Sequence, residues 1–119
     1  MSDLSGRELD AVVCGMMEAR PAMRGRYAEP SGDGWWVWRD WLHGEGWLPR
    51  PVSTDIAWAM RAYGVMNGRG WQMDLKHEEA DWRCVLIRFD EAAGAVLEGG
   101  LAPTPAEAIC RAIVEAGGE

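Results

Sequence analysis

Residues 71–102 read as three consecutive β-strands, and this run constrains the fold more than any other part of the chain. The segment "GWQMDLKH" alternates Trp71, Met73 and Leu75 with polar residues, which is the two-residue period of a half-buried strand. After a short acidic turn, "WRCVLIRF" is almost entirely apolar and is predicted to be the central strand. "GAVLEGGLA" adds a third strand, so the sequence predicts an antiparallel three-stranded sheet.

A helix follows these strands and carries start and stop signals at both ends. Thr104 and Glu107 form a capping box, and Pro105 occupies the first helical position. Gly117 and Gly118 are expected to end the helix. Its inward side is expected to comprise Ala108, Ile109, Ala112 and Ile113.

A second capping box opens the chain. Ser5 with Glu8 predicts the start of a helix that ends near Arg20, because Pro21 follows. Apolar residues recur along it at helical spacing, and its inner face is expected to comprise Leu9, Val12, Val13, Met16 and Met17.

The segment "VSTDIAWAMRAYGVM" predicts a middle helix. Ser53 or Thr54 can cap its start, and Asp55 is placed favourably at the positive end of the helix dipole. Its inner stripe is expected to comprise Ile56, Met60 and Tyr63.

Between these two helices, at about residues 21–52, the pattern dissolves into glycine, proline, arginine and tryptophan. At most one short strand is expected there, around residues 35–38. The predicted order is α-loop-α-β-β-β-α in one domain spanning residues 1–119. Strands bracketed by helices favour an α+β fold, a small α/β sandwich in which the antiparallel three-stranded sheet packs with helices.

Composition narrows the partners and the compartment. A net charge of −7 argues against a duplex nucleic acid partner. Cys14, Cys84 and Cys110 lie far apart in apolar segments and are predicted to be buried thiols in a reducing cytoplasm. Charges interrupt the first residues and no apolar run is long enough for a membrane span, so a soluble cytoplasmic protein without a membrane partner is expected.

Three segments, "SGRELDAVVCGMM", "RPVSTDIAWAM" and "APTPAEAICRAIVEA", cover both ends and the centre of the chain. Together they resemble the signature blocks of the phage ABA-sandwich domain family, small proteins encoded in bacteriophages and prophages. The resemblance implies a small α/β sandwich. Some relatives are Thoeris anti-defence proteins, sponges that bind the cyclic ADP-ribose signal made by bacterial TIR-domain immune enzymes. The tryptophan-rich "GWWVWRDWLHGEGW" departs from the family pattern, so the ligand can differ.

The resemblance implies a phage-encoded protein that acts in the cytoplasm of an infected bacterial host cell. Its partner would be a cyclic nucleotide signalling molecule, of the cyclic ADP-ribose type or a cyclic oligonucleotide, which it sequesters without turnover. The alternative is a non-catalytic structural or regulatory phage protein whose tryptophan-rich loop mediates protein–protein or self association.

Three of the loop's tryptophans, Trp38, Trp41 and Trp47, are candidate ligand contacts. They can stack on a nucleobase, or they can cover the core or form a subunit interface, where aromatic residues are enriched. The interface interpretation is preferred, although a ligand between subunits would satisfy both. A homo-oligomer is expected because the tryptophans exceed what a core of this size can use.

Candidate phosphate contacts come from arginines and helix starts. Arg24, Arg26 and Arg50 lie in the loop and offer forked donors to a pyrophosphate, although such arginines are usually solvated or ion-paired. Ser53, Thr54 and Thr104 place hydroxyls and backbone N–H groups at two helix starts, where anions are favoured. Capping fully accounts for these residues, and phosphate binding would be an additional role. Arg111 lies off the inner stripe of the last helix and can face solvent, a salt bridge or a partner, and it is counted as a candidate ligand contact.

Evidence for catalysis is thin. His43 and His77 have no metal-ligand spacing with cysteine or glutamate, and the chain has no nucleophile-elbow or phosphate-loop motif. The carboxylates from Glu78 to Asp81 fall in the expected hairpin turn, so a hydrolase that uses them is the weakest hypothesis. We therefore predict a protein that is not an enzyme and has no cofactor or metal.

Overall fold

The three predicted strands form one antiparallel sheet of order β3-β4-β5, with β4 at its centre. The computed structural model describes residues 6–18, 34–41, 44–91 and 94–117. Its helices and strands are α1 (Arg7–Met17), β1 (Trp36–Trp41), β2 (Gly44–Pro49), α2 (Ile56–Gly68), β3 (Gln72–Glu78), β4 (Asp81–Asp90), β5 (Gly94–Ala102) and α3 (Pro105–Gly117). The α+β prediction and the order of its main helices and strands are therefore confirmed.

Alternation along β3 sets the two faces of the sheet. Met73 and Leu75 are partly buried on the helix side, whereas the polar residues between them are exposed. Trp71, just before the strand, is 2% exposed. The expected turn joins β3 to β4, with Glu78 paired to Asp81 and Glu79 at a φ of 54°.

Helix α3 packs directly on β4 and β5, and Gly100 makes the close approach possible. A Cβ atom at Gly100 would lie 2.5 Å from the carbonyl oxygen of Ala108 and 2.6 Å from the amide nitrogen of Ala112. Only a residue without a side chain fits there. The start of α3 is as predicted, because the Thr104 hydroxyl accepts the N–H of Glu107 at 3.3 Å. The predicted inward side of α3 is also buried.

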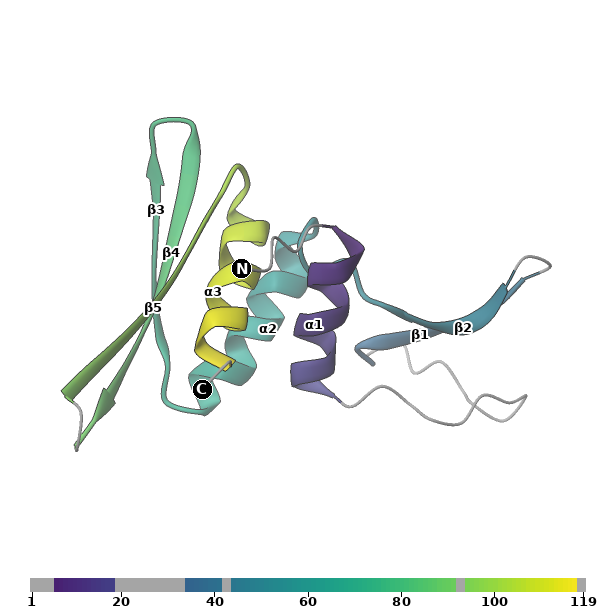
Figure 1. The fold of residues 1–119 in the computed structure, drawn as a ribbon, viewed down its shortest axis with the longest axis horizontal. Coiled ribbons are helices and arrows are strands. Elements are labelled where there is room, and N and C mark those ends of the chain that lie inside the picture. The colour runs from purple at the N-terminus through teal and green to yellow at the C-terminus, as the bar shows by residue number, and fades with distance from the viewer. Residues whose placement is uncertain (1–5, 19–33, 42–43, 92–93, 118–119) are drawn as a thin grey trace.

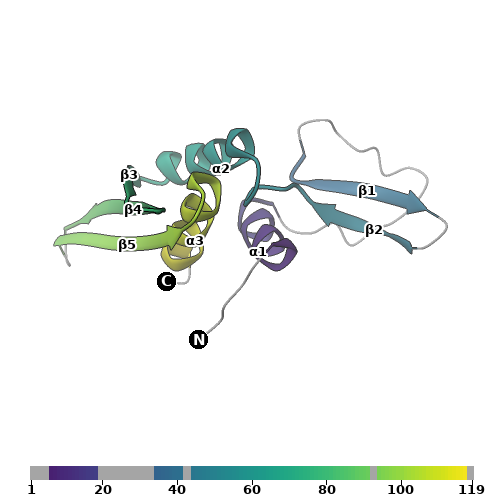
Figure 2. The same cartoon turned by 90° about the horizontal axis from the view of Figure 1, so that it is seen from above.

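Helices α1 and α2 both pack against α3. The sheet therefore lies at one end of an elongated molecule, the helices in the middle, and a hairpin at the other end (Figure 1 and Figure 2). Helix α1 begins at Arg7 with Gly6 as its N-cap residue and no side-chain cap, whereas Ser5 of the predicted capping box lies outside the described residues. It ends at Met17, three residues before the predicted end. On its inner face Leu9 and Val13 are buried, whereas Val12 is 36% exposed.

Helix α2 buries a different face from the predicted one. Ala59, Ala62 and Met66 form its buried side, whereas Ile56 and Met60 are 45% and 42% exposed. Tyr63 is partly buried and accepts a hydrogen bond from Asn67. Helix α2 packs against α3, and small buried side chains such as these alanines let two helices approach closely. The prediction selected the large apolar side chains, whereas the face that is buried contains the small alanine side chains.

The tryptophan-rich insertion holds more structure than the single short strand that the sequence predicts. Strands β1 and β2 form an antiparallel hairpin, whose register pairs Trp36 with Pro49 and Trp38 with Trp47. At its base, Trp36 is buried, and its indole N–H donates to the carbonyl oxygen of Glu18 at 2.9 Å. This bond anchors the hairpin to the end of α1.

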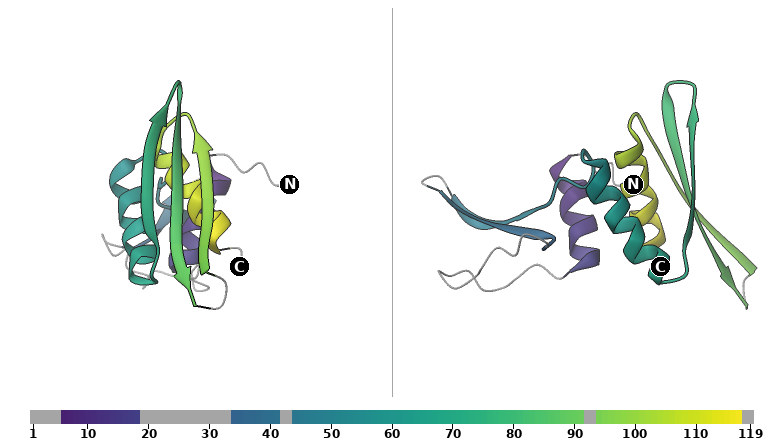
Figure 3. Two further views of the ribbon diagram at one scale, coloured as in Figure 1. Left: turned by 90° about the vertical axis from the view of Figure 1, so that its left-hand side faces the viewer. Right: turned by 180° about the vertical axis from the view of Figure 1, so that it is seen from behind.

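The face of the sheet turned away from the helices is open in the described structure (Figure 3, left). Several large apolar side chains are exposed there: Ile87, Phe89, Leu97 and Leu101. None of the helices in the described part of the chain is long and apolar enough to span a membrane.

Candidate functional site

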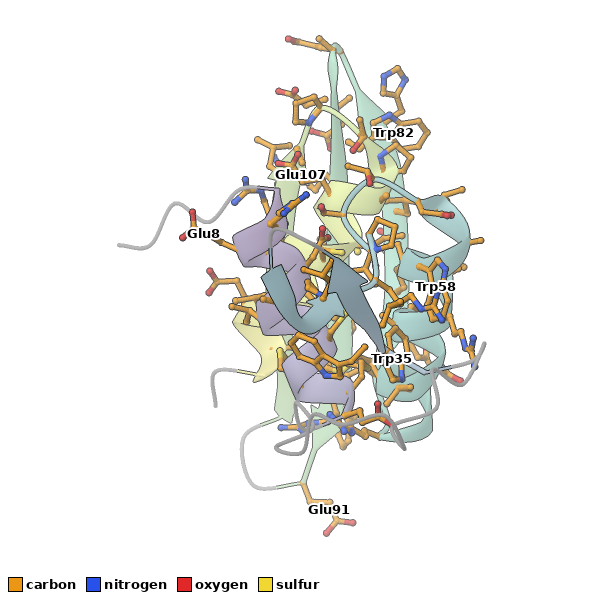
Figure 4. The ribbon with its side chains drawn as sticks, turned by 90° about the vertical axis from the view of Figure 1, so that its right-hand side faces the viewer. Glu8, Trp35, Trp58, Trp82, Glu91 and Glu107 are labelled. Atoms are coloured by element: carbon orange, nitrogen blue, oxygen red, sulfur yellow. The ribbon has the colours of Figure 1, made fainter. Side chains whose placement is uncertain are left out.

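Two tryptophans and two arginines meet between the base of the hairpin and α2. Trp35 precedes β1, Arg50 follows β2, and Trp58 and Arg61 belong to α2. We call these four residues the arginine–tryptophan cluster. Figure 4 views the molecule from the hairpin side and labels both tryptophans.

The cluster is built around the indole of Trp58. The Trp35 and Trp58 rings meet edge to face, with their centroids 5.3 Å apart and their planes at 66°. The guanidinium carbons of Arg50 and Arg61 each lie 4.8 Å from the centroid of the Trp58 ring, and that of Arg61 lies 5.8 Å from the Trp35 ring. Each such cation–π contact stabilises by about 0.5–1 kcal/mol at an exposed site.

Backbone hydrogen bonds fix the hairpin half of the cluster. The N–H of Arg50 donates to the carbonyl oxygen of Trp35 at 3.0 Å, which adds one bond to the ladder beyond the Trp36–Pro49 pair. The Arg50 side chain donates through Nε to the carbonyl oxygen of Gly34 at 2.8 Å. The hairpin ladder therefore places Arg50 beside Trp35, fifteen positions earlier in the chain, and the two hydrogen bonds fix the orientation of Arg50.

Helical spacing positions the two cluster residues that belong to α2. Trp58 and Arg61 are three residues apart on α2, so their side chains share one face of the helix. Trp58 is partly buried and Arg61 is exposed. Among the described residues Arg61 contacts the two indoles and forms no ion pair. A guanidinium that rests on an aromatic ring keeps its N–H groups along its edge, where they fit a carboxylate or phosphate.

Only part of the predicted loop site can be compared with the structure. Arg24 and Arg26 lie outside the described residues. For Trp38, Trp41 and Trp47 the structure gives the backbone register of β1 and β2 alone. Arg50 is the predicted loop residue that the structure places in the cluster.

The hydroxyls at the start of α2 do not cap it, so that expectation is wrong. Asp55 is the cap residue, and its carboxylate accepts the N–H of Ala57 at 3.0 Å. Ser53 is buried, its N–H donates to Asp10, and its hydroxyl has no hydrogen-bond partner among the described residues. Thr54 is exposed and its hydroxyl donates to the carbonyl oxygen of Pro51 at 3.4 Å. Neither residue joins the cluster.

Thr104 and Arg111 meet at Glu107 instead. Thr104 caps α3 through the Glu107 N–H, and Arg111 donates from Nε and Nη2 to one carboxylate oxygen of Glu107, at 2.9 and 2.8 Å. Of the three roles open to Arg111, the salt bridge is the one observed. Arg111 also lines a separate hollow of about 210 Å³ between α3 and β5. The carboxylate of Glu115 lines this hollow as well and disfavours an anion there.

The three cysteines are buried and unpaired, as predicted. Burial raises the pKa of the Cys14 thiol from 9.0 to about 11 and that of Cys84 to about 12, and it raises the pKa of Cys110 as well. Protonated thiols are weak nucleophiles and weak metal ligands. Within the described ranges, no three histidine, cysteine, aspartate or glutamate side chains are grouped as metal ligands.

Sequence reasoning missed three members of the cluster, Trp35, Trp58 and Arg61, although the three-residue spacing of the last two is a readable signal for a shared helix face. It also missed Asp10, whose buried carboxylate accepts the Ser53 N–H. No local pattern marks that contact, because the two residues are 43 positions apart.

Comparisons with known proteins assign no family. No family model, no curated protein and no solved structure matches the chain. The resemblance to the phage ABA-sandwich family stays a prediction from three sequence blocks.

Proposed function

We propose that this protein is a non-catalytic sponge that binds a cyclic nucleotide signal, of the cyclic ADP-ribose type or a cyclic oligonucleotide, and holds it intact. The signal class comes from the resemblance to the phage ABA-sandwich family. The binding site is the arginine–tryptophan cluster.

The observation that carries the proposal is the position of Arg61. Its exposed guanidinium lies against two indole rings and has no carboxylate partner among the described residues. A cyclic nucleotide combines phosphate oxygens with a base that has a flat π face. Arginine suits the phosphates, and stacking of a base on an aromatic side chain contributes about 1–3 kcal/mol per base in single-strand binders. Trp35 is 8% exposed and the Trp58 ring already carries two guanidiniums, so we propose that the base stacks on the exposed guanidinium plane of Arg61, whose edge binds the phosphate.

The net charge of −7 opposes an anionic ligand. This repulsion acts over long distances, and physiological salt screens it beyond about 8 Å. Hydrogen bonds from a contacting guanidinium act at roughly 3 Å and are strengthened by the charge. Short-range contacts therefore decide the affinity, and the long-range field lowers the rate of encounter.

Binding without turnover is supported by the described groups near the cluster. The Cys14 thiol is buried and donates to the carbonyl oxygen of Arg50, and burial raises its pKa to about 11. Arginine and tryptophan side chains bind and orient a ligand but do not transfer protons near neutral pH.

The experiment is a depletion and release assay. Purified protein is mixed with cyclic ADP-ribose isomers and, separately, with cyclic dinucleotides, and the free signal is measured after filtration. Heat denaturation then releases the bound fraction for mass analysis. Recovery of unmodified signal supports the sponge. Recovery of a linearised product would mean an enzyme, and no depletion of any signal would reject the proposal.

A further inference from the structure

The outer face of the β3-β4-β5 sheet carries large apolar side chains, as a surface covered by another protein does. Phe89 is 77% exposed, Leu97 62% and Leu101 51%, and Ile87 lies between them at 36%. All four belong to the outward-pointing set of β4 and β5, because the alternate residues Cys84 and Leu86 are buried against α3. Contiguous apolar surface of this kind marks an interaction site.

The same face carries a hollow. Gly99 has no side chain, and the space beside it, about 190 Å³, is lined by Arg83, Val85, Gly99, Gly100 and Leu101. The register places Val85 opposite Gly99, Ile87 opposite Leu97, and Phe89 opposite Ala95. The protruding Phe89 and the hollow at Val85 and Gly99 therefore lie at equal distances on either side of the Ile87–Leu97 pair.

We infer that a second copy of this chain covers this face. A two-fold axis that lies in the interface, crosses the strands and passes through the Ile87–Leu97 pair turns each copy end for end. It brings Phe89 of each copy over the hollow beside Gly99 of the other copy. The face is complementary to itself, which is the requirement of an isologous dimer.

Charge on the face agrees with this arrangement. Its polar end is neutralised internally by the ion pairs of Lys76 with Asp74 at 3.5 Å and Arg83 with Glu78 at 3.4 Å. The exposed carboxylate of Glu91 follows the end of β4, two residues beyond Phe89. The two-fold axis brings it opposite Arg83 of the second copy, which would then lie between Glu91 of one copy and Glu78 of its own chain.

The area fits a weak dimer. About this axis, residues 84–90 of β4 and 94–100 of β5 of one copy overlie the same residues of the other, a region of roughly 23 by 10 Å on each copy. Packing over it removes on the order of 500 Å² of accessible surface from the two copies, which corresponds to an association that needs high protein concentration. The arginine–tryptophan cluster lies where α2 meets the base of the hairpin. The hairpin and the sheet lie at opposite ends of the molecule (Figure 1), so a dimer through the sheet leaves the cluster uncovered. The dimer therefore forms through the sheet, and the tryptophan-rich hairpin is not needed for it.

The test is the mass in solution of the whole chain and three variants, measured by sedimentation equilibrium over a concentration series. Gly99→Leu fills the hollow, and its Cβ meets nothing closer within its own chain than the carbonyl oxygen of Cys84 at 3.7 Å. Phe89→Ser removes the protruding aromatic side chain that would enter the hollow. Ile56→Ser is the matched control, because Ile56 is an exposed apolar residue on α2.

The wild type and Ile56→Ser are expected at twice the 13.2 kDa of one chain. Gly99→Leu and Phe89→Ser are expected to raise the dimer dissociation constant at least tenfold, with thermal melts that show folded protein. A wild type that stays at one chain mass at high micromolar concentration overturns the inference. So does a dimer that both sheet variants leave unchanged.

Discussion

The backbone N–H of Ser53 donates to Oδ1 of Asp10 at 2.8 Å, and this buried bond ties the segment before α2 to the first turns of α1. Asp10 is 7% exposed, so its carboxylate replaces the water that the Ser53 N–H loses on folding. A buried donor without a partner costs about 1–3 kcal/mol. The contact therefore holds two helix starts together at the edge of the core.

Replacing Asp10 with alanine is expected to lower the free energy of unfolding by about 1–3 kcal/mol, because the Ser53 N–H loses its acceptor. Asp10→Asn keeps an oxygen at the same place and should lose less. Urea denaturation followed by circular dichroism measures both. Glu8→Ala, an exposed acid in the same helix turn, is the control, and an equal loss in all three variants would rule out this role for Asp10.

Two neighbouring glycines on β5 should respond differently to alanine. At Gly100 the new Cβ would lie 2.5 Å from a backbone oxygen of α3, so Gly100→Ala must push the helix off the sheet. Overpacking of this kind costs about 1–3 kcal/mol. At Gly99 the nearest atom is 3.7 Å away, so Gly99→Ala should melt within error of the wild type. Equal melting temperatures for the two variants would contradict the close packing of α3 on β5.

The cap of α3 gives a smaller effect. Thr104→Ala removes the hydroxyl that accepts the Glu107 N–H, and loss of a side-chain cap typically costs about 1 kcal/mol. The midpoint of urea denaturation should fall accordingly. Thr104→Ser keeps a hydroxyl at this position and should restore most of the loss. An alanine variant with an unchanged midpoint would show that the bond contributes nothing.

The sequence predicted the fold well wherever a local pattern alone decides the secondary structure. The two-residue period around Met73 and the capped helix after Thr104 both decide local structure directly, and both are confirmed. The inner face of α2 was mispredicted because Ala59 and Ala62 bury little area, so a pattern weighted by side-chain size selects Ile56 and Met60 instead. Close packing against α3 has no local signature.

The candidate site was predictable only in part, because contacts between separate elements have no local sequence signature. Arg50 stood out as an arginine in a tryptophan-rich loop, and it does belong to the cluster. Its partner Trp58 lies on a separate element, and the contact arises from how the hairpin base meets α2. The hydroxyl of Ser53 was expected at a helix start, yet the backbone bond to Asp10 holds the residue in the core.

Alkaline pH should destabilise the fold through its buried thiols. In the unfolded chain the thiols ionise with a pKa near 9.0, whereas burial raises the pKa to about 11 at Cys14 and about 12 at Cys84. The folded state therefore keeps protons that the unfolded state releases. Stability from this source is complete below pH 9 and declines as the pH rises towards about 12. Urea midpoints measured across this range should fall, and less steeply in Cys84→Ala. A parallel decline would exclude Cys84 as a contributor.

The central claim is that the arginine–tryptophan cluster binds the signal, and one matched pair of variants tests it most directly. Arg61→Gln removes the guanidinium that lies against Trp35 and Trp58, whereas Arg69→Gln removes the same charge from the other end of α2. Both proteins are titrated with the signal that the wild type depletes, and the dissociation constant is measured by calorimetry. We expect Arg61→Gln to weaken binding at least tenfold, about 1.4 kcal/mol, and Arg69→Gln to bind within twofold of the wild type. Equal affinities for the two variants would contradict the assignment of the cluster as the binding site.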